Sequence, residues 1–311
     1  MSELILRTRE LTRRYGRTLA LDRASLSVEK GQILGLVGRN GAGKTTLIRL
    51  ISGQSRPTSG ELALFGASSP SALDRARSRT GVMVETPAFY PYLTAEQNLE
   101  YYRIQRGIPG RSCVDEALEL VRLTGAGKKK FKTFSLGMKQ RLGLALALMN
   151  QPEFLLLDEP INGLDPEGIV EFRELLLRLN RERQTTILIS SHILSELSAL
   201  ATHYAFIDRG RMLETISAAD LRERCRDCLE LRVDDAARAA QVLEEQLGTR
   251  DFEVLPQERL RLYAFLDQPQ TVNRVLMEQG VGLISAQQKD SNLEDYFLSL
   301  IDGHSAGKEG D

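Results

Sequence analysis

The hydrophobic and polar positions of the first 53 residues predict two alternating strands, one buried strand and one helix. Residues 5–16 and 19–31 alternate in polarity and end on turn glycines, which is typical of exposed antiparallel strands. Residues 32–38, QILGLVG, form a continuous apolar run that predicts a buried strand. Residues 44–53, KTTLIRLISG, have helical spacing and end on a glycine. A glycine-rich loop, GRNGAGKTT at 38–46, therefore joins the buried strand to the helix.

The middle of the chain predicts a helical insert followed by a second set of buried strands. Residues 92–149 have mostly helical spacing, with one helix predicted to begin at Thr94. Two further buried strands, FLLLDEP at 154–160 and TTILISSH at 185–192, flank a predicted helix at 166–182. A strand, a helix and a strand in this order favour a parallel sheet and hence an α/β core.

The chain after about residue 216 predicts a separate small domain. Its pattern gives strands at 229–233, 252–255, 259–265 and 282–288, and helices at 236–248, 269–280 and 292–301. The order β-α-β-β-α-β is that of a ferredoxin-like split βαβ unit. We therefore expect an α/β domain at 1–216 with a helical subdomain at about 87–150, an accessory or regulatory α+β domain at 217–303, and a polar tail at 304–311.

Composition narrows the class of protein. The 311 residues are 42% hydrophobic and 27% charged with a net charge of -1, which argues against a general nucleic-acid-binding protein. The first ten residues lack the apolar core of a secretory signal, so the chain is expected to stay inside the cell. The longest apolar run, at 142–149, is far shorter than the roughly 20 residues of a membrane helix, so we expect no bilayer span.

Two smaller features have ordinary interpretations. Cys225 and Cys228 form a C-x-x-C pair, but the third cysteine, Cys113, is distant, so we favour ordinary thiols over a metal or redox site. The basic run KKKFK at 128–132 is interpreted as a solvated loop, with contact to anionic lipid headgroups as the alternative.

The glycine-rich loop carries the chemistry of phosphate binding. Gly38-x-x-x-x-Gly43-Lys44-Thr45 matches the Walker A pattern, in which backbone N–H groups surround phosphates, the lysine neutralises them and the threonine hydroxyl binds Mg²⁺. Glycines are needed because the backbone itself must approach the phosphate oxygens. The predicted nucleotide-binding residues of this loop are Gly38, Arg39, Asn40, Gly41, Ala42, Gly43, Lys44, Thr45 and Thr46.

A second pair of acidic residues completes the predicted site. Asp158 and Glu159 follow the apolar strand at 154–157, at the sheet edge where ligands bind in α/β proteins. We interpret Asp158 as an Mg²⁺ ligand together with Thr45, and Glu159 as the group that polarises the attacking water.

A third motif resembles the signature sequence of a known protein family. FSLGMKQR at 134–141 resembles the L-S-G-G-Q signature of the ATP-binding cassette (ABC) ATPases that drive membrane transporters. Ser135 and Gly137 match the serine and second glycine of the signature, whereas Leu136 and Met138 replace its first glycine and its glutamine. The resemblance implies a P-loop NTPase core with an antiparallel β subdomain and a helical subdomain. It further implies that Ser135 and Gly137 bind the γ-phosphate.

The resemblance extends to four more positions. Tyr15 corresponds to the aromatic residue that stacks on adenine, and Asp165 in NGLDP corresponds to the D-loop at the subunit interface. His192 matches the switch histidine that contacts the γ-phosphate. Glu85 replaces the Q-loop glutamine and would approach Mg²⁺ or the water. The implied catalytic residues are Lys44, Glu85, Glu159 and His192.

The resemblance implies an ATP-hydrolysing subunit that requires Mg²⁺. Glu85, the SLGMKQR signature and a terminal LEDYFL are similar to the bacitracin-resistance and lantibiotic-immunity exporter ATPases, which implies export of an antimicrobial peptide or related compound. The expected partners are ATP, a second copy of the chain and a separate membrane permease, with no nucleic acid. The expected location is cytoplasmic, at the inner face of the membrane. The alternative is a soluble ABC-type ATPase that acts as a regulated switch without transport.

Overall fold

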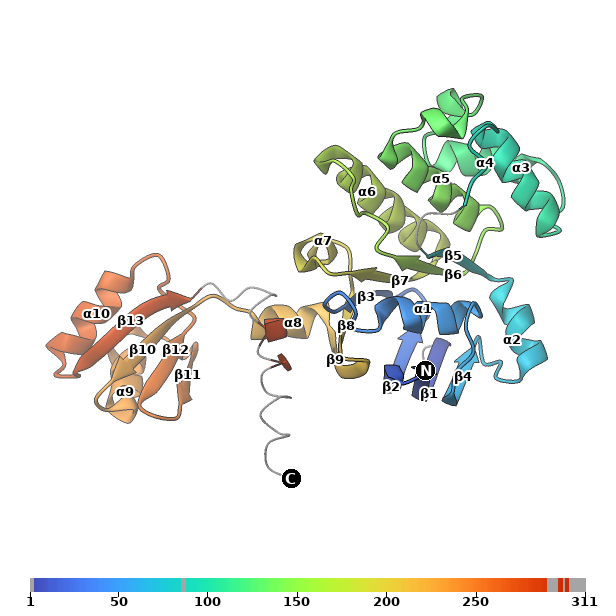
Figure 1. Cartoon of the computed structure of the whole chain (residues 1–311). Helices are drawn as coiled ribbons and strands as arrows, with labels where there is room; N and C mark the ends of the chain where they lie inside the picture. The colour runs from blue at the N-terminus through green and yellow to red at the C-terminus, as the bar shows by residue number, and fades with distance from the viewer. Residues whose placement is uncertain (1–2, 85–87, 290–295, 299, 302–311) are drawn as a thin grey trace. The chain divides into compact units, whose positions relative to one another are not determined.

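The computed structural model describes residues 3–84, 88–289, 296–298 and 300–301. The chain divides into two compact units, Met1–Ala218 and Ala219–Asp311 (Figure 1). Each unit is described separately below. Within the described residues, no helix combines the length and apolar character that crossing a bilayer requires.

A six-stranded sheet forms the centre of the first unit. Its strands lie in the order β5 (Thr80–Val84), β6 (Phe154–Asp158), β7 (Thr186–Ser191), β3 (Ile33–Val37), β8 (His203–Asp208) and β9 (Arg211–Ser217). The first five strands are parallel, and only β9 runs antiparallel to its neighbour. Every residue of β3, β6 and β7 is buried, which explains why their sequences are continuous apolar runs rather than alternating ones.

A second, antiparallel sheet packs against the first across one helix. Its order is β2 (Thr18–Glu29), β1 (Leu4–Tyr15) and β4 (Ser59–Leu64), and α1 (Lys44–Ser52) lies between the two sheets (Figure 1). We expected β1 and β2 to be exposed, and the structure corrects this. One face is buried, with Leu6, Leu11 and Leu21 fully covered, because these side chains belong to the same hydrophobic core as α1.

Helices cover the opposite face of the six-stranded sheet. They include α5 (Leu136–Leu148), α6 (Pro166–Arg183) and the short α7 (Leu194–Ser198), and α3 (Ala95–Gln105) and α4 (Ser112–Leu120) pack on α5 (Figure 1). The short α2 (Pro70–Arg77) lies instead beside β4 of the antiparallel sheet. Thr94 and Gln97 form the predicted capping box at the start of α3. Most of α5 is buried, which explains its apolar composition on all sides.

The second unit has the element order β-α-β-β-α-β after a short helix, α8 (Ala218–Arg224). These elements are β10 (Cys228–Val233), α9 (Ala236–Leu247), β11 (Phe252–Leu255), β12 (Arg259–Leu262), α10 (Pro269–Glu278) and β13 (Leu283–Lys289). The sheet order is β11-β12-β10-β13 and every pairing is antiparallel. Alternate residues of β10 and β12 pack on the two helices and form the core. The helix expected at 292–301 lies partly outside the described residues. Within that range, the described residues 296–298 and 300–301 are helical.

A buried asparagine organises the entry to the helical subdomain. Asn98 is fully buried, its Nδ2 donates to the carbonyls of Tyr90, Leu93 and Thr94, and its Oδ1 accepts from the Tyr90 N–H at 2.7 Å. One side chain thus bonds the Tyr90 N–H and three carbonyls of the 90–94 turn, and those carbonyls also accept from backbone N–H groups. An unpaired buried polar group would otherwise carry its full desolvation cost.

We expect Asn98→Ala to destabilise the protein by about 2 kcal/mol, because it leaves the Tyr90 N–H without its partner and removes one hydrogen bond from each of three carbonyls. The measurement is the thermal unfolding temperature, which should fall by about 5 °C or more for a unit of this size. Asn150→Ala is the matched control, because that exposed residue makes one side-chain bond, to the Ser78 carbonyl. Equal effects of the two substitutions would contradict this role of Asn98.

Candidate functional site

Three adjacent parallel strands end at one edge of the six-stranded sheet, and the candidate site lies there. Strand β3 leads into the glycine-rich loop, β6 ends at Asp158 and β7 ends at Ser191, next to His192. The register pairs Val37 with Ser191 and Asp158 with Ser190. Segments more than 100 residues apart in sequence therefore meet at the carboxyl edge of the sheet, where ligands bind in such folds.

The glycine-rich loop has a conformation that requires glycine. Gly41 and Gly43 have φ angles of 80° and 109°, which L-residues rarely adopt. A Cβ on Gly38 would lie 2.5 Å from the Ile207 carbonyl oxygen, and one on Gly43 would lie 2.8 Å from that of Ala20. Gly43 also precedes α1 without a side-chain cap, so the first N–H groups of this helix are left for a ligand.

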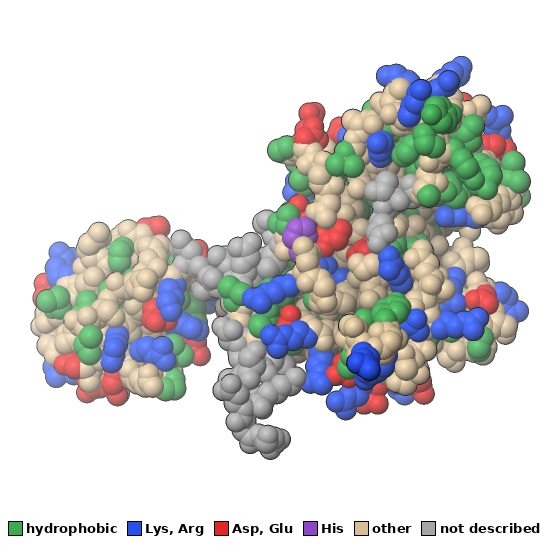
Figure 2. All heavy atoms as spheres, viewed as in Figure 1, with side chains coloured by type: hydrophobic (Ala, Val, Ile, Leu, Met, Phe, Trp, Pro, Cys, Tyr) green, Lys and Arg blue, Asp and Glu red, His purple; other side chains and the backbone are tan. Residues whose placement is uncertain are grey.

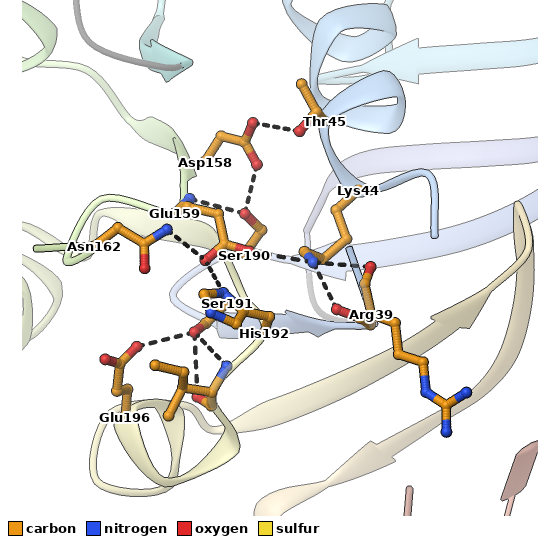
Figure 3. Close-up of polar contacts among 12 residues, drawn as sticks. Arg39, Lys44, Thr45, Asp158, Glu159, Asn162, Ser190, Ser191, His192 and Glu196 are labelled. Atoms are coloured by element: carbon orange, nitrogen blue, oxygen red, sulfur yellow. Dashed lines mark hydrogen bonds and ion pairs between the residues drawn. The ribbon is translucent and has the colours of Figure 1, made fainter. Parts of the chain in front are cut away.

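Lys44 curls back over the loop that precedes it. Its Nζ donates to the carbonyls of Gly38 at 2.6 Å and Arg39 at 3.3 Å, and the side chain is only 6% exposed (Figure 3). Next to it lies a cavity of about 200 Å³. The residues that line the cavity are Ala20, Arg39, Asn40, Gly41, Ala42, Gly43, Lys44, Thr45, Thr46 and Glu159. A buried cation beside free helix N–H groups attracts an anion.

Asp158 receives a hydrogen bond on each of its carboxylate oxygens. The Thr45 hydroxyl donates to Oδ2 at 2.7 Å, and the Ser190 hydroxyl donates to Oδ1 at 2.6 Å (Figure 3). The carboxylate is 6% exposed, so its orientation is set by these two partners. A hydroxyl and a carboxylate side by side are oxygen ligands of the kind that Mg²⁺ binds together with substrate phosphates.

Glu159 lies between a cation and a histidine. Its Oε1 is 3.2 Å from Lys44 Nζ, and its Oε2 is 2.8 Å from His192 Nδ1 and 3.4 Å from Asn162 Nδ2 (Figure 3). A carboxylate oxygen only accepts, so the imidazole proton is on Nδ1. Glu159 has a φ of 48°, which is costly for a residue other than glycine and directs its side chain toward the loop.

These residues fit a nucleotide with its magnesium ion. An added Cβ on Gly43 at the cavity would collide with the Ala20 carbonyl, and Glu159 Oε1 is a buried acceptor that has an ion pair with Lys44 but no hydrogen bond. Among the described residues no group of three or more His, Cys, Asp and Glu side chains could hold a metal. A divalent ion here would therefore depend on Thr45, Asp158 and the phosphates themselves.

The signature and D-loop residues lie at two other helix starts. Ser135 caps α5, where its hydroxyl accepts from the Met138 N–H, and Asp165 caps α6, where it accepts from the Gly168 N–H. The Leu136 side chain covers Gly163, so close that a Cβ there would clash. No hydrogen bond or ion pair found among the described residues joins Ser135 or Asp165 to the glycine-rich loop.

The structure describes the surroundings of Tyr15 but not those of Glu85. Tyr15 does not line the cavity beside Lys44: its hydroxyl lies 3.2 Å from Ser55 Oγ, and the Arg13 guanidinium lies 4.4 Å from its ring centre. The hydrogen bond with Ser55 lowers the pKa of the Tyr15 phenol. Glu85 lies outside the described residues.

Two residues at the site were not among the candidates from sequence. Ser190 was visible only as one serine in ISSH, and Asn162 only as the first residue of NGLDP. A hydroxyl at the end of a buried strand next to the strand of Asp158 is the signal that could have found Ser190.

Comparison with known proteins gives consistent matches. Residues 21–162 match the protein family described as ABC transporter. The bacitracin transport ATP-binding protein BcrA of Bacillus licheniformis is 42% identical, over 97% of this chain and 99% of that protein. The lantibiotic transport ATP-binding protein SrtF of Streptococcus pyogenes is 38% identical, over 67% of this chain and 89% of that protein.

One solved structure shows the fold of the first unit in another protein. A dimeric ATP-binding cassette in a post-hydrolysis state, bound to ADP and Pi, superposes with a TM-score of 0.63. The match covers 69% of this chain and 99% of that chain at 23% identity, which shows a shared fold.

The two loop glycines allow a test of backbone geometry. Gly41→Ala should cost about 1–2 kcal/mol, because its φ is positive but nothing lies within 4 Å of a Cβ there. Gly43→Ala should destabilise the protein more and weaken ATP binding more, because its Cβ would also collide with the Ala20 carbonyl. Thermal unfolding and calorimetric titration with ATP measure both effects. Equal losses in the two variants would show that the close approach at Gly43 is unimportant.

Proposed function

This chain belongs to the ATP-binding proteins of ABC transporters, and from that premise we propose that it hydrolyses MgATP at the Lys44 site to power export of an antimicrobial peptide. The observation that carries the catalytic part is the convergence of Lys44, Thr45, Asp158, Glu159 and His192 at one sheet edge. The cargo class rests on two relatives whose names state bacitracin transport and lantibiotic transport.

The roles of the side chains follow from their contacts. The N–H groups of the loop and the Lys44 ammonium hold the phosphates, and Thr45 and Asp158 hold Mg²⁺. When bound, Mg²⁺ neutralises phosphate charge and aligns the γ-phosphate. Glu159 accepts a proton from the attacking water, and His192 contacts the γ-phosphate while its Nδ1–H keeps Glu159 in place.

The phosphates would also release Glu159 for this role. Lys44 is paired with Glu159 as well as with two backbone carbonyls. A γ-phosphate beside Lys44 carries more negative charge than one carboxylate and would take over this ion pair. Glu159 would then be free to bind the attacking water.

We propose a head-to-tail homodimer as the hydrolysing species. Ser135, Gly137 and Asp165 lie at the starts of α5 and α6, and within one chain no described contact joins them to the loop at Lys44. In a symmetric dimer they would close over the nucleotide that the other copy holds, with Asp165 at the interface. The dimeric state of the cassette with the same fold supports this arrangement.

The second unit is proposed as an accessory domain of ferredoxin-like fold at 217–303. Its β-α-β-β-α-β order and the strand order β11-β12-β10-β13 support this assignment. The first domain would then occupy 1–216, with its helical subdomain at about 87–150.

A separate permease is proposed to bind the helical subdomain at the inner face of the membrane. Tyr90, Tyr92, Tyr101 and Ile104 form a surface that we call the α3 patch. Tyr92 and Ile104 are 72% and 64% exposed, and Figure 2 shows apolar side chains gathered over α3. Tyr90 and Tyr101 are in edge-to-face contact at 4.9 Å, and Lys132 Nζ lies 5.1 Å from the Tyr92 ring centre. Exposed aromatic side chains of this kind are typical of protein interfaces.

We expect Glu159→Gln to abolish steady-state ATP hydrolysis but to retain ATP binding, because only the proton acceptor is lost. The variant should accumulate as an ATP-bound dimer in size-exclusion chromatography with light scattering. Glu182→Gln, which changes an exposed residue near the end of α6, is the control and should hydrolyse ATP normally. Near-normal turnover in Glu159→Gln would remove Glu159 from this role.

The permease proposal is tested by purification from the membranes of the host in mild detergent. Tagged wild-type protein should recover a multi-span membrane protein in stoichiometric amount. The double variant Tyr92→Ala/Ile104→Ala should recover at least about 10-fold less of that protein, and its basal ATPase activity should be unchanged. Met277→Ala, which removes an exposed apolar side chain of the second unit, is the control. An ATP-dependent dimer without any membrane partner would favour a switch rather than a transporter.

A further inference from the structure

Ser190 forms hydrogen bonds with two acidic residues of the site, Asp158 and Glu159. It lies in β7, directly opposite Asp158 of β6 in the parallel register, and its side chain is fully buried. Its hydroxyl donates to Asp158 Oδ1 at 2.6 Å and accepts from the Glu159 N–H at 3.0 Å (Figure 3). A hydroxyl has one proton and two lone pairs, so both bonds exist together.

The bond to Asp158 fixes the plane of that carboxylate. Thr45 holds one oxygen and Ser190 holds the other, so rotation of the carboxylate would break at least one bond. Because Asp158 is almost fully buried, water is poorly placed to replace either partner. Hydrogen bonds of this kind orient metal-ligating carboxylates in proteins.

The bond to Glu159 supports a costly backbone conformation. With a φ of 48°, Glu159 has a conformation that its own side chain disfavours. Its N–H is held by Ser190, and its carboxylate is held by Lys44 and His192. Strained backbone persists at functional sites where neighbouring groups hold it in place.

The neighbouring serine has different partners. Ser191 Oγ accepts from the Ile193 N–H at 2.9 Å and donates to Glu196 Oε2 at 3.0 Å. This follows from the alternation of side chains along β7, which places consecutive residues on opposite faces of the sheet. Of these two serines, Ser190 is therefore the one whose hydroxyl bonds to the residues at the end of β6.

We propose that Ser190 is a positioning residue for ATP hydrolysis, which holds the Asp158 carboxylate for Mg²⁺ and the Glu159 backbone for water activation through one hydroxyl. The proposal rests on the proposed roles of Asp158 and Glu159. It explains why a buried, apolar strand has a serine at this position.

The test compares Ser190→Ala with Thr186→Val in the full chain. Thr186 is also in β7 and fully buried, and its hydroxyl accepts from the Gly31 N–H at the opposite end of the strand. Both substitutions remove one buried hydroxyl, but only Ser190→Ala affects the acidic residues. Steady-state kinetics give kcat, and calorimetric titration gives the ATP affinity with and without Mg²⁺.

For Ser190→Ala we expect kcat to fall about 10- to 100-fold. We also expect the factor by which Mg²⁺ increases the ATP affinity to fall about 10-fold. Both are the usual effect of removing a hydrogen bond to a metal-binding side chain. The affinity for ATP without Mg²⁺ should be unchanged, because the glycine-rich loop is intact. Thr186→Val should lower the unfolding temperature but change neither kcat nor the Mg²⁺ effect. Ser190→Thr, which retains the hydroxyl, should recover most of the lost kcat.

The proposal would be overturned if Ser190→Ala and Thr186→Val had the same kcat and the same increase in ATP affinity with Mg²⁺. A folded Ser190→Thr that recovers none of the activity would do the same, because the hydroxyl would then not be the determinant. Absence of Mg²⁺-dependent hydrolysis in the wild-type protein would instead contradict the proposed function.

Discussion

The parallel register of β3, β6 and β7 is the constraint on which the site depends. It brings the glycine-rich loop, Asp158 and Ser190 to one edge, although Thr45 and Asp158 are 113 residues apart in sequence. Side chains alternate along a strand, so a shift of one residue in β7 would turn Ser190 away from Asp158. The complete burial of these strands fixes the register, because any slip would change the packing on both faces of the sheet.

Charge compensation explains how Lys44 and Glu159 are arranged in the site. A lysine that is only 6% exposed must be paired, and Lys44 is paired with two carbonyls and Glu159. In the proposed function the same lysine would pair with a phosphate, so nucleotide binding and the release of Glu159 would be linked through one cation. His192 and Asn162 hold the other carboxylate oxygen, which limits how far Glu159 can move.

The departures from the usual signature motif also have a local physical basis. Leu136, in place of a glycine, covers Gly163, where a Cβ would collide with the Leu136 side chain unless that side chain moved. The start of α5 is thereby packed against the loop that leads to Asp165. The signature and the D-loop are therefore in direct contact, and a change of position in one would be transmitted to the other. Leu136 is also 47% exposed, which leaves part of its apolar surface open to a partner.

Several parts of the fold and site could be predicted from sequence because their signals are local. The apolar runs at β3, β6 and β7, the cap at Thr94 and the β-α-β-β-α-β order of the second unit depend on neighbouring residues. The Walker A loop was recognisable because glycine spacing directly reflects backbone geometry, as the φ angles of Gly41 and Gly43 show.

The short strands β4 and β5 and the burial of one face of β1 and β2 were not predicted, because those features depend on which partner packs against them. The contact of the Tyr15 hydroxyl with Ser55, 40 residues away in sequence, depends in the same way on a distant segment.

The sequence by itself determined that the chain binds phosphate through a glycine-rich loop, because the residue types needed for that chemistry are adjacent in the chain. Only the tertiary structure decided that Ser190 joins Asp158 to Glu159. The two bonds of its hydroxyl cross from β7 to β6, over 32 residues to Asp158, and only the pairing of those strands brings these groups within hydrogen-bond distance.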